Sequence, residues 1–173
     1  MAPFSKTAQE PRPPSSASVP EVTFRIAQPS DDAALRAFLS AAGLPWTDVS
    51  AAHQDYLLAH SGQALAGTVG LEVHGPSALL RSLAVAEPLR GRGLGSALFE
   101  RALAHAALRG VEVLYLLTLT AERFFAARGF ERIERSGVPP DVAGSQEFRS
   151  LCPASATCMR RRLDSARVPA GNG

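Results

Sequence analysis

The chain has 173 residues, 46% of them hydrophobic and 20% charged, and its formal net charge is +2. This composition is typical of one globular domain, and no apolar run reaches the roughly 18 residues that a membrane-spanning helix needs. Residues 1–18 contain no apolar stretch that could serve as a secretory signal, so we expect a cytoplasmic protein.

The basic and thiol side chains exclude several kinds of chemistry. Lys6 is the only lysine and lies in a proline-rich head, so neither a P-loop nor a pyridoxal Schiff base is expected. The arginines are scattered, and only residues 160–162 run together, which argues against a nucleic-acid partner. Cys152 and Cys158 alone make neither a disulfide framework nor a zinc site, and the histidines show no metal spacing, so no metal is expected.

Apolar periodicity and turn residues predict the elements of one domain over residues 21–164, between tails over 1–20 and 165–173 that we expect to be disordered. In chain order these elements are a strand over 22–27, helices over 32–42 and 47–53, strands over 56–60, 65–74 and 79–86, a helix that begins at 94 and is closed by Gly110, a strand over 111–119, a helix over 121–128, a loop over 136–144, a turn of helix over 146–151 and a strand over 157–163. Strands and helices interleave without strict alternation, so we expect an α/β (α+β) domain with one mixed sheet and helices on both faces.

The strands over 65–74 and 79–86 are predicted to form a β-hairpin around Gly75-Pro76-Ser77. A three-residue loop there would place Glu72 opposite Leu80 and Gly70 opposite Ser82.

The glycine-rich stretch after this hairpin carries the chemistry. Arg90-Gly91-Arg92-Gly93-Leu94-Gly95-Ser96 opens a helix, whose first turn presents unpaired backbone N–H groups and the positive end of the helix dipole. The glycines allow a close approach of the backbone to an anion, and the two arginines add positive charge at the rim. The stretch therefore predicts a phosphate site. The dinucleotide fingerprint does not fit, because its third glycine would fall on Ser96 or Leu98.

Arg90-x-x-Gly93-x-Gly95, with a Leu-Ala-Val strand before it and an amphipathic helix after it, resembles the signature of the GNAT acetyltransferases. Residues 124–130, which end in Gly-Phe, resemble a later motif of that family, and the likeness spans residues 22–163. The resemblance implies a mostly antiparallel, GNAT-like sheet of six to seven strands and an enzyme that transfers acetyl from acetyl-CoA to an amine. The acetyl-CoA-binding residues would then be Leu83, Ala84, Val85, Arg90, Gly91, Arg92, Gly93, Leu94, Gly95 and Ser96.

Residues 80–85, 115–118 and 147–156 together resemble the arsenic-resistance-associated branch of that family, whose relatives acetylate glutamate-like herbicidal or arsenical antibiotics. The branch implies a detoxification role and a small-molecule amine substrate. Arg81, Ser82 and Arg149 are then the candidate substrate-binding residues, because guanidinium groups bind carboxylates in a forked geometry. The alternative for each arginine is a surface ion pair.

Acetyl transfer needs a neutral amine nitrogen, so a base that removes its proton is expected. Glu72 is the candidate, because a carboxylate in the middle of an apolar strand requires an explanation; the alternative is a residue that faces solvent. Phe125 occupies the position at which many GNAT enzymes carry a tyrosine that protonates the departing thiolate, so no side-chain general acid is predicted.

Two other functions stay open at this point: a non-catalytic acyl-CoA sensor, and a thiol-based arsenical-binding protein that uses Cys152 and Cys158, since thiolates favour soft ions. Dimers are common in the family, but neither the oligomeric state nor the acceptor amine can be read from this sequence.

Overall fold

The structure is a computed structural model that describes residues 21–50 and 53–164. The tails predicted over 1–20 and 165–173 lie outside the described residues. The strands are β1 (Val22–Ile26), β2 (Gln54–Ser61), β3 (Ala64–His74), β4 (Ser77–Val85), β5 (Val113–Thr118), β6 (Glu131–Arg132) and β7 (Thr157–Arg162). The α-helices are α1 (Asp32–Ala41), α2 (Leu94–Leu108), α3 (Glu122–Ala126) and α4 (Pro140–Ala143), and a π-helical segment spans Glu147–Leu151.

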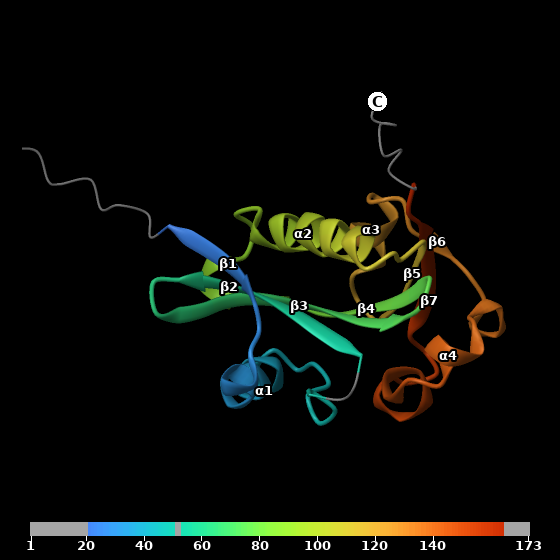
Figure 1. Ribbon diagram of the computed structural model, residues 1–173, viewed down its shortest axis with the longest axis horizontal. Coiled ribbons are helices and arrows are strands. Elements are labelled where there is room, and N and C mark those ends of the chain that lie inside the picture. The colour runs from blue at the N-terminus through green and yellow to red at the C-terminus, as the bar shows by residue number, and fades with distance from the viewer. Residues whose placement is uncertain (1–20, 51–52, 165–173) are drawn as a thin grey trace, which may run out of the picture.

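The strands form one seven-stranded sheet in the order β1-β2-β3-β4-β5-β7-β6. Only β4 and β5 pair in parallel, because α2 carries the chain back between them; the other neighbours are antiparallel. Helices α2 and α3 cover one face of the sheet, and α1 and α4 lie on the other (Figure 1). The fold predicted from the sequence, a mixed and mostly antiparallel sheet flanked by helices, is confirmed.

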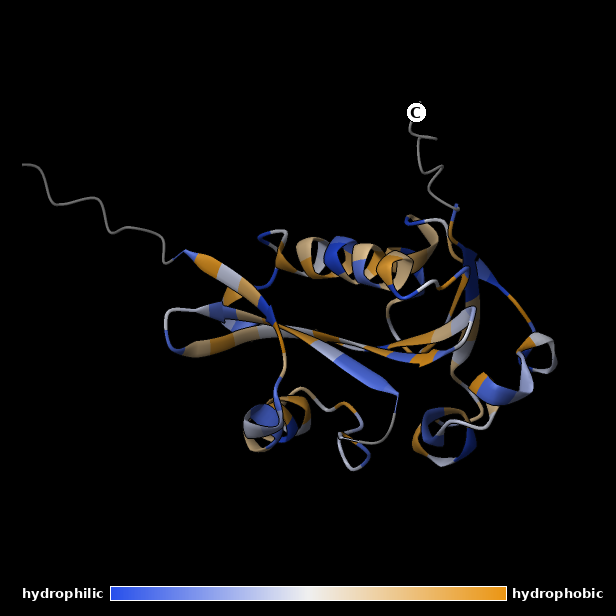
Figure 2. Ribbon diagram, in the orientation of Figure 1, coloured by the Kyte–Doolittle hydropathy of each residue, from blue (hydrophilic) through white to orange (hydrophobic). Residues whose placement is uncertain are grey.

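The main apolar core lies between α2 and the sheet. Leu98, Phe99 and Ala102 are fully buried there, because the apolar stripe of α2 faces the apolar side of β3 and β4 (Figure 2). Removing a large core side chain such as Phe99 typically costs about 3–5 kcal/mol, so this layer fixes the position of α2 and of the loop that precedes it.

The opposite face of the sheet has a different composition. It carries two smaller apolar clusters, one around Leu35 and Leu58 under α1 and one around Leu79 and Val142 near α4. Buried polar side chains of β3 and β4 lie on this same face, and the N-terminal end of β2, which follows the short grey trace, is coloured hydrophilic in Figure 2. This polar region is the part of the fold that the functional site uses.

The β3–β4 hairpin differs from the predicted register by one residue. His74 pairs with Ser77, so the turn has two residues, with Gly75 at φ +59° before Pro76. Glu72 therefore lies opposite Leu79 rather than Leu80, and Gly70 opposite Arg81 rather than Ser82. Because side chains alternate across a strand, this single-residue shift moves Arg81 onto the face that carries Glu72.

Two further expectations are corrected. The described residues between 47 and 53 form turns rather than a helix, and Ser50 and His53 have positive φ angles of 78° and 70°, which a helix does not accept. The loop predicted over 136–144 contains the short helix α4, which begins at Pro140, a residue well suited to a first helical position.

A β-bulge in β4 shapes the centre of the sheet. Ser82 adopts φ +55°, and Ser82 and Leu83 together lie opposite the single residue Val69 of β3. Pairing of β4 with β5 runs only from Ser77 to Leu79, so it stops just before this bulge and does not resume after it. The bulge thus keeps the two central strands apart.

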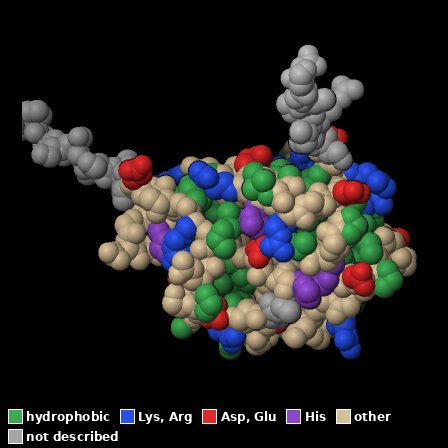
Figure 3. All heavy atoms as spheres, in the orientation of Figure 1, with side chains coloured by type: hydrophobic (Ala, Val, Ile, Leu, Met, Phe, Trp, Pro, Cys, Tyr) green, Lys and Arg blue, Asp and Glu red, His purple; other side chains and the backbone are tan. Residues whose placement is uncertain are grey.

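On the described part of the face shown in Figure 3, basic and acidic side chains are interspersed and neither sign forms a large patch. None of the helices within residues 21–50 and 53–164 has the length and apolar character that a membrane crossing requires.

Gly70→Ala is expected to lower the free energy of unfolding by about 1–3 kcal/mol, the cost of overpacking a tight core site. A Cβ atom at residue 70 would lie 2.7 Å from Cε1 of Tyr56 and 3.1 Å from Cγ of Arg81, so both side chains would have to move. Urea unfolding measures the change. Gly137→Ala is the matched control, because a Cβ there meets its nearest atom only at 4.0 Å. Equal losses in both variants would contradict the prediction.

Candidate active site

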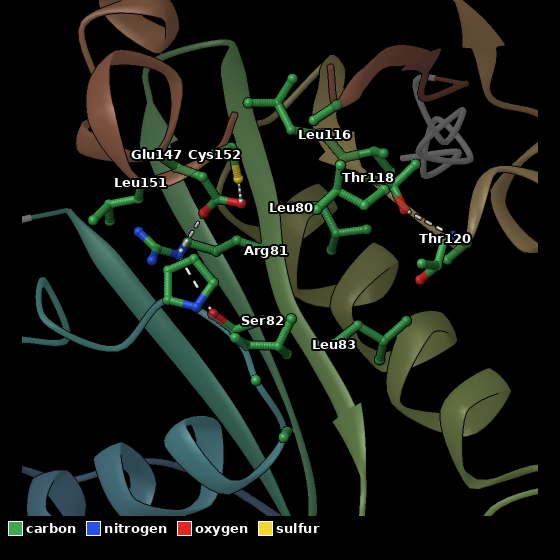
Figure 4. A pocket seen from close by; sticks show the side chains of 18 of the residues that line it. Leu80, Arg81, Ser82, Leu83, Leu116, Thr118, Thr120, Glu147, Leu151 and Cys152 are labelled. Atoms are coloured by element: carbon green, nitrogen blue, oxygen red, sulfur yellow. Dashed lines mark hydrogen bonds and ion pairs between the residues drawn. The ribbon is translucent and has the colours of Figure 1, made fainter. Parts of the chain in front are cut away.

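A cavity of about 750 Å³ opens where β4 and β5 separate. Residues 80–83 of β4 form one wall and residues 116–118 of β5 the other, and residues 42–47 and the π-helical segment close the end near α1 (Figure 4). The cavity is therefore a direct consequence of the bulge at Ser82 that keeps the two strands apart.

Between the end of its pairing with β5 at Leu79 and its last residue, Val85, β4 pairs along one edge only, with β3. β5 pairs with β7 along its other edge over its whole length, from Val113 to Thr118. The other edge of β4 therefore offers backbone N–H and C=O groups to a ligand in the cavity. One of these groups is already used within the described chain: the Val85 carbonyl accepts a hydrogen bond from Nε of Arg90 at 3.0 Å.

The glycine-rich loop continues directly from this edge of β4. Gly91 and Gly93 have φ angles of +73° and +83°, which only glycine adopts at little cost, and α2 begins at the next residue, Leu94. No side chain caps this helix start, so its first N–H groups are available to an anion. The structure brings the predicted residues 83–85 and 90–96 together at this end of β4.

An arginine that the sequence analysis did not single out lies beside the same helix start. Nη2 of Arg128 donates to Oγ of Ser96 at 2.6 Å, and its guanidinium carbon is 3.5 Å from the ring centroid of Phe124. Phe124 and Phe125 pack edge-to-face, and Phe125 also lies on the cavity wall.

The part of the cavity lined by Arg81 adjoins a buried cluster of charges. Arg81 is at the centre of this cluster, and its side chain is 0% exposed. Its two terminal nitrogens donate to Asp48 at 2.5 and 2.7 Å, and its Nε contacts Glu147 at 3.0 Å. Glu72 lies 3.4 Å from Nη1. Three carboxylates from three separate segments thus surround one guanidinium.

Neighbouring polar groups extend this cluster on the side away from the cavity. Nε2 of His74 lies 3.1 Å from Glu72, and Gln54 donates to both Asp48 and Glu72 at 3.3 and 3.4 Å. The hydroxyl group of Tyr56 is buried without a hydrogen-bond partner among the described residues.

Burial and charge act on the proton affinities of the cluster in opposite directions. Burial lowers the pKa of Arg81, but its hydrogen bonds to Asp48 and the nearby carboxylates raise the pKa above its ordinary value, so the guanidinium stays charged. Burial raises the pKa of Glu147, and Arg81 opposes this rise without cancelling it. Burial, together with Glu147, raises the pKa of the Cys152 thiol to about 12, so this cysteine is protonated at neutral pH.

The predicted substrate-binding residues and the predicted base lie in different parts of the structure. Arg81 and Ser82 lie on the cavity wall, whereas Glu72, 6% exposed, lies behind Arg81 and is not part of that wall. Arg149 is exposed on the π-helical segment, outside the cavity lining.

The two cysteines are also in different surroundings. Cys152 lines the cavity and lies 3.6 Å from Glu147, whereas Cys158 is buried in an apolar cluster with Tyr115. Within the described part of the chain, no three His, Cys, Asp or Glu side chains are grouped as ligands of a metal ion would be.

Sequence reasoning missed Asp48 and Glu147 as members of the site. Asp48 lies 33 residues before Arg81 in a loop, and no pattern links the two. Glu147 begins a stretch that was singled out for its family likeness, and its place in a π-helical turn, a conformation common at functional sites, is visible only in the structure.

Residues 52–132 match the family model described as the acetyltransferase (GNAT) domain. The match includes β4, β5 and the glycine-rich loop between them, so it covers the two walls of the cavity. The matched region also contains the signature at Arg90–Gly95 from which the sequence predicts this family. No curated protein matches the sequence.

Solved GNAT structures share the fold at low sequence identity. N-acetylglutamate synthase from Neisseria gonorrhoeae, complexed with coenzyme A and L-arginine, has a TM-score of 0.67 at 19% identity over 82% of this chain, which spans 33% of the synthase chain. An acetyltransferase of the GNAT family from Staphylococcus aureus Mu50 has a TM-score of 0.68 at 17% identity, covering 83% of this chain and 100% of its own. The ribosomal-protein-S18-alanine N-acetyltransferase from Escherichia coli has a TM-score of 0.65 at 18% identity, covering 86% and 98%.

Glu147→Gln is expected to change how the stability of the protein depends on pH. Because the pKa of Glu147 is raised on folding, the folded protein binds more protons than the unfolded chain above the ordinary value of 4.5. The free energy of unfolding of the wild type therefore falls as pH rises from there through the raised folded-state pKa, and the variant, which cannot ionise at this position, lacks that loss.

Urea unfolding at a series of pH values from 4 upward (a range set by the ordinary carboxylate pKa of about 4.3) measures the difference. Glu100→Gln, at an exposed position on α2, is the control and is expected to follow the wild type. A difference between Glu147→Gln and wild type that does not change with pH would contradict the prediction.

Proposed function

We propose that this protein transfers the acetyl group of acetyl-CoA to the amino group of a small molecule. The observation that carries the proposal is the unpaired edge of β4, which leads directly into the glycine-rich start of α2. An extended pantetheine arm needs backbone partners of this kind, and a pyrophosphate needs N–H groups at a helix start. Solved GNAT structures with coenzyme A bound support the same assignment.

In this proposal each part of the acetyl-CoA site has a defined task. Residues 83–85 of β4 hold the pantetheine, and residues 90–96 hold the pyrophosphate. Arg90 and Arg92 add positive charge at the exposed rim of the loop. A backbone N–H near Val85 polarises the thioester carbonyl, which is the electrostatic contribution to catalysis.

Glu72 is the base that the sequence predicts, and its surroundings give it a path for the proton. Its Oε1 atom lies 3.1 Å from Nε2 of His74, whose side chain is partly exposed. A proton taken up by Glu72 could therefore leave through His74 to solvent. Because Arg81 separates Glu72 from the cavity, this role requires a bridging water between the carboxylate and the acceptor nitrogen.

The acceptor and the biological role are proposed on the sequence resemblance. It supports a toxic glutamate-like or organoarsenical amino acid as acceptor, a detoxification role in arsenic resistance and a cytoplasmic location. Arg81 and Arg149 are the arginines proposed to bind the acidic groups of such an acceptor.

Gly93→Ala tests the acetyl-CoA site. An alanine at φ +83° costs about 1–2 kcal/mol and shifts the loop amides, so we expect at least a tenfold weaker binding of acetyl-CoA, measured by calorimetry. Gly110→Ala is the matched control: its φ is +74°, it also faces open space, and it lies at the other end of α2. The control should lose similar stability and keep its affinity. Equal affinities in the two variants would contradict the assignment.

A panel of acceptor amines tests the reaction. Purified protein, acetyl-CoA and a thiol reagent that detects released CoA are combined with glutamate-like, organoarsenical, uncharged and polyamine acceptors, and one class is expected to turn over faster than the others. Cys158→Ser should leave this turnover unchanged, since Cys158 lies in an apolar cluster and is not part of the cavity lining. If acetyl-CoA binds but no acceptor turns over, the proposed reaction is wrong.

A further inference from the structure

Few charged side chains line the cavity, and they differ in whether a ligand can reach them. Among the described residues that line the cavity, Arg81 is the only basic side chain and Glu147 the only acidic one. Arg81 is fully covered, and each of its three nitrogens contacts a carboxylate of Asp48, Glu72 or Glu147. Because its side chain is 0% exposed, it offers no accessible charge to an acid in the cavity, so Glu147 is the charge that an acceptor meets.

Glu147 is held in a fixed orientation at that wall. Its Oε2 atom contacts Nε of Arg81 at 3.0 Å, and its Oε1 atom lies 3.6 Å from the thiol of Cys152. Figure 4 shows these contacts on either side of the carboxylate, beside Leu151. A carboxylate oxygen has two acceptor sites, so each oxygen keeps one for a ligand.

The cluster contains more negatively charged groups than positively charged ones. Asp48, Glu72 and Glu147 share one guanidinium, and the partly exposed His74 contacts only Glu72. Buried like charges repel each other, so a cation placed at Glu147 would relieve this surplus. An ammonium group is such a cation.

We infer that Glu147 binds the ammonium group of the acceptor and takes a proton from it, and that the acceptor is a primary amine with an uncharged, apolar remainder. This inference rests on the proposed acetyl transfer and departs from the glutamate-like acceptor that the sequence resemblance supports. In this inference Glu147, which contacts the amine directly, takes the role of base in place of Glu72, which would act through a bridging water.

The proton balance of the step is simple. One N–H bond of the ammonium breaks and its proton passes to Glu147, which leaves a lone pair on nitrogen. That lone pair forms the C–N bond to the acetyl carbon as the C–S bond breaks. A second proton from nitrogen goes to the departing thiolate, and Glu147 returns the first to solvent.

The surroundings of Glu147 suit this task. The charged and titratable groups that face it are Arg81 from β4, Asp48 from the loop after α1, Glu72 from β3, Tyr56 from β2, and Cys152. Burial raises its pKa, which brings its proton affinity closer to neutral pH, where a general base is most effective.

The remaining lining favours an apolar acceptor. Leu119 and Trp46 keep 64% and 39% of their surfaces exposed, and both belong to the cavity lining. They offer contact area to a hydrocarbon or aromatic group. A carboxylate next to the amine would instead face Glu147 without a free cation to pair with.

Acceptor pairs that differ only in a carboxylate test the acceptor class on the wild-type protein. Phenethylamine against phenylalanine, and tyramine against tyrosine, are compared by kcat/KM in the CoA-release assay. We expect each amine to exceed its amino acid by at least about tenfold, the smallest effect of an unpaired buried charge. Equal or higher rates with the amino acids, or with glutamate-like acceptors, would overturn the inference while leaving the proposed acetyl transfer intact.

Glu147→Gln and Glu72→Gln test the assigned base with the best amine. Glu147→Gln should lower kcat/KM by at least about 100-fold and remove the acid limb of its pH profile, while acetyl-CoA affinity stays unchanged. Glu72→Gln should lower kcat/KM less than Glu147→Gln and keep that limb. The opposite order would overturn the role of Glu147. Failure of the wild type to bind acetyl-CoA would instead refute the proposed function.

Discussion

Arg81 places a positive charge inside the protein, and the carboxylates of Asp48, Glu72 and Glu147 are what make this possible. A buried guanidinium is tolerated only when it is paired, and removal of one partner typically costs about 3–5 kcal/mol. The partners come from the loop after α1, from β3 and from the π-helical segment. The loop and the π-helical segment, the two irregular parts that close the cavity, are therefore held to the central strand by the same charge.

The bulge in β4 places an unpaired strand edge next to this charge cluster. Ser82 follows Arg81 directly, and its positive φ turns the strand away from β5 just after the charge cluster. One strand thus carries the buried cluster on its face and an unpaired edge beside the cavity. The proposed proton acceptor Glu147 contacts Arg81, and the proposed acetyl-CoA site begins two residues later on the same strand, so the two sites are adjacent.

The surplus of negative charge explains why such a costly cluster is useful. If stability alone were required, apolar side chains of similar volume would serve as well or better. A guanidinium that is already shared among three carboxylates leaves one of them, Glu147, short of positive charge at the cavity wall. Burial raises the pKa of Glu147, and the nearby carboxylates add to this rise. The surplus of negative charge also creates a place for the ammonium group of an acceptor.

The sequence by itself determined the sheet with its helices, the glycine-rich start of α2 and the resemblance to a family. Local patterns encode these features: apolar alternation, capping groups, and glycines at 91 and 93 that must adopt positive φ. Only the tertiary structure decided which groups surround Arg81 beside the cavity. A two-residue rather than three-residue turn moved Arg81 to the face of Glu72, and Asp48 and Glu147 reach it from 33 and 66 residues away (81 − 48 and 147 − 81). Contacts at such separations depend on strand register and loop packing, which no local pattern specifies.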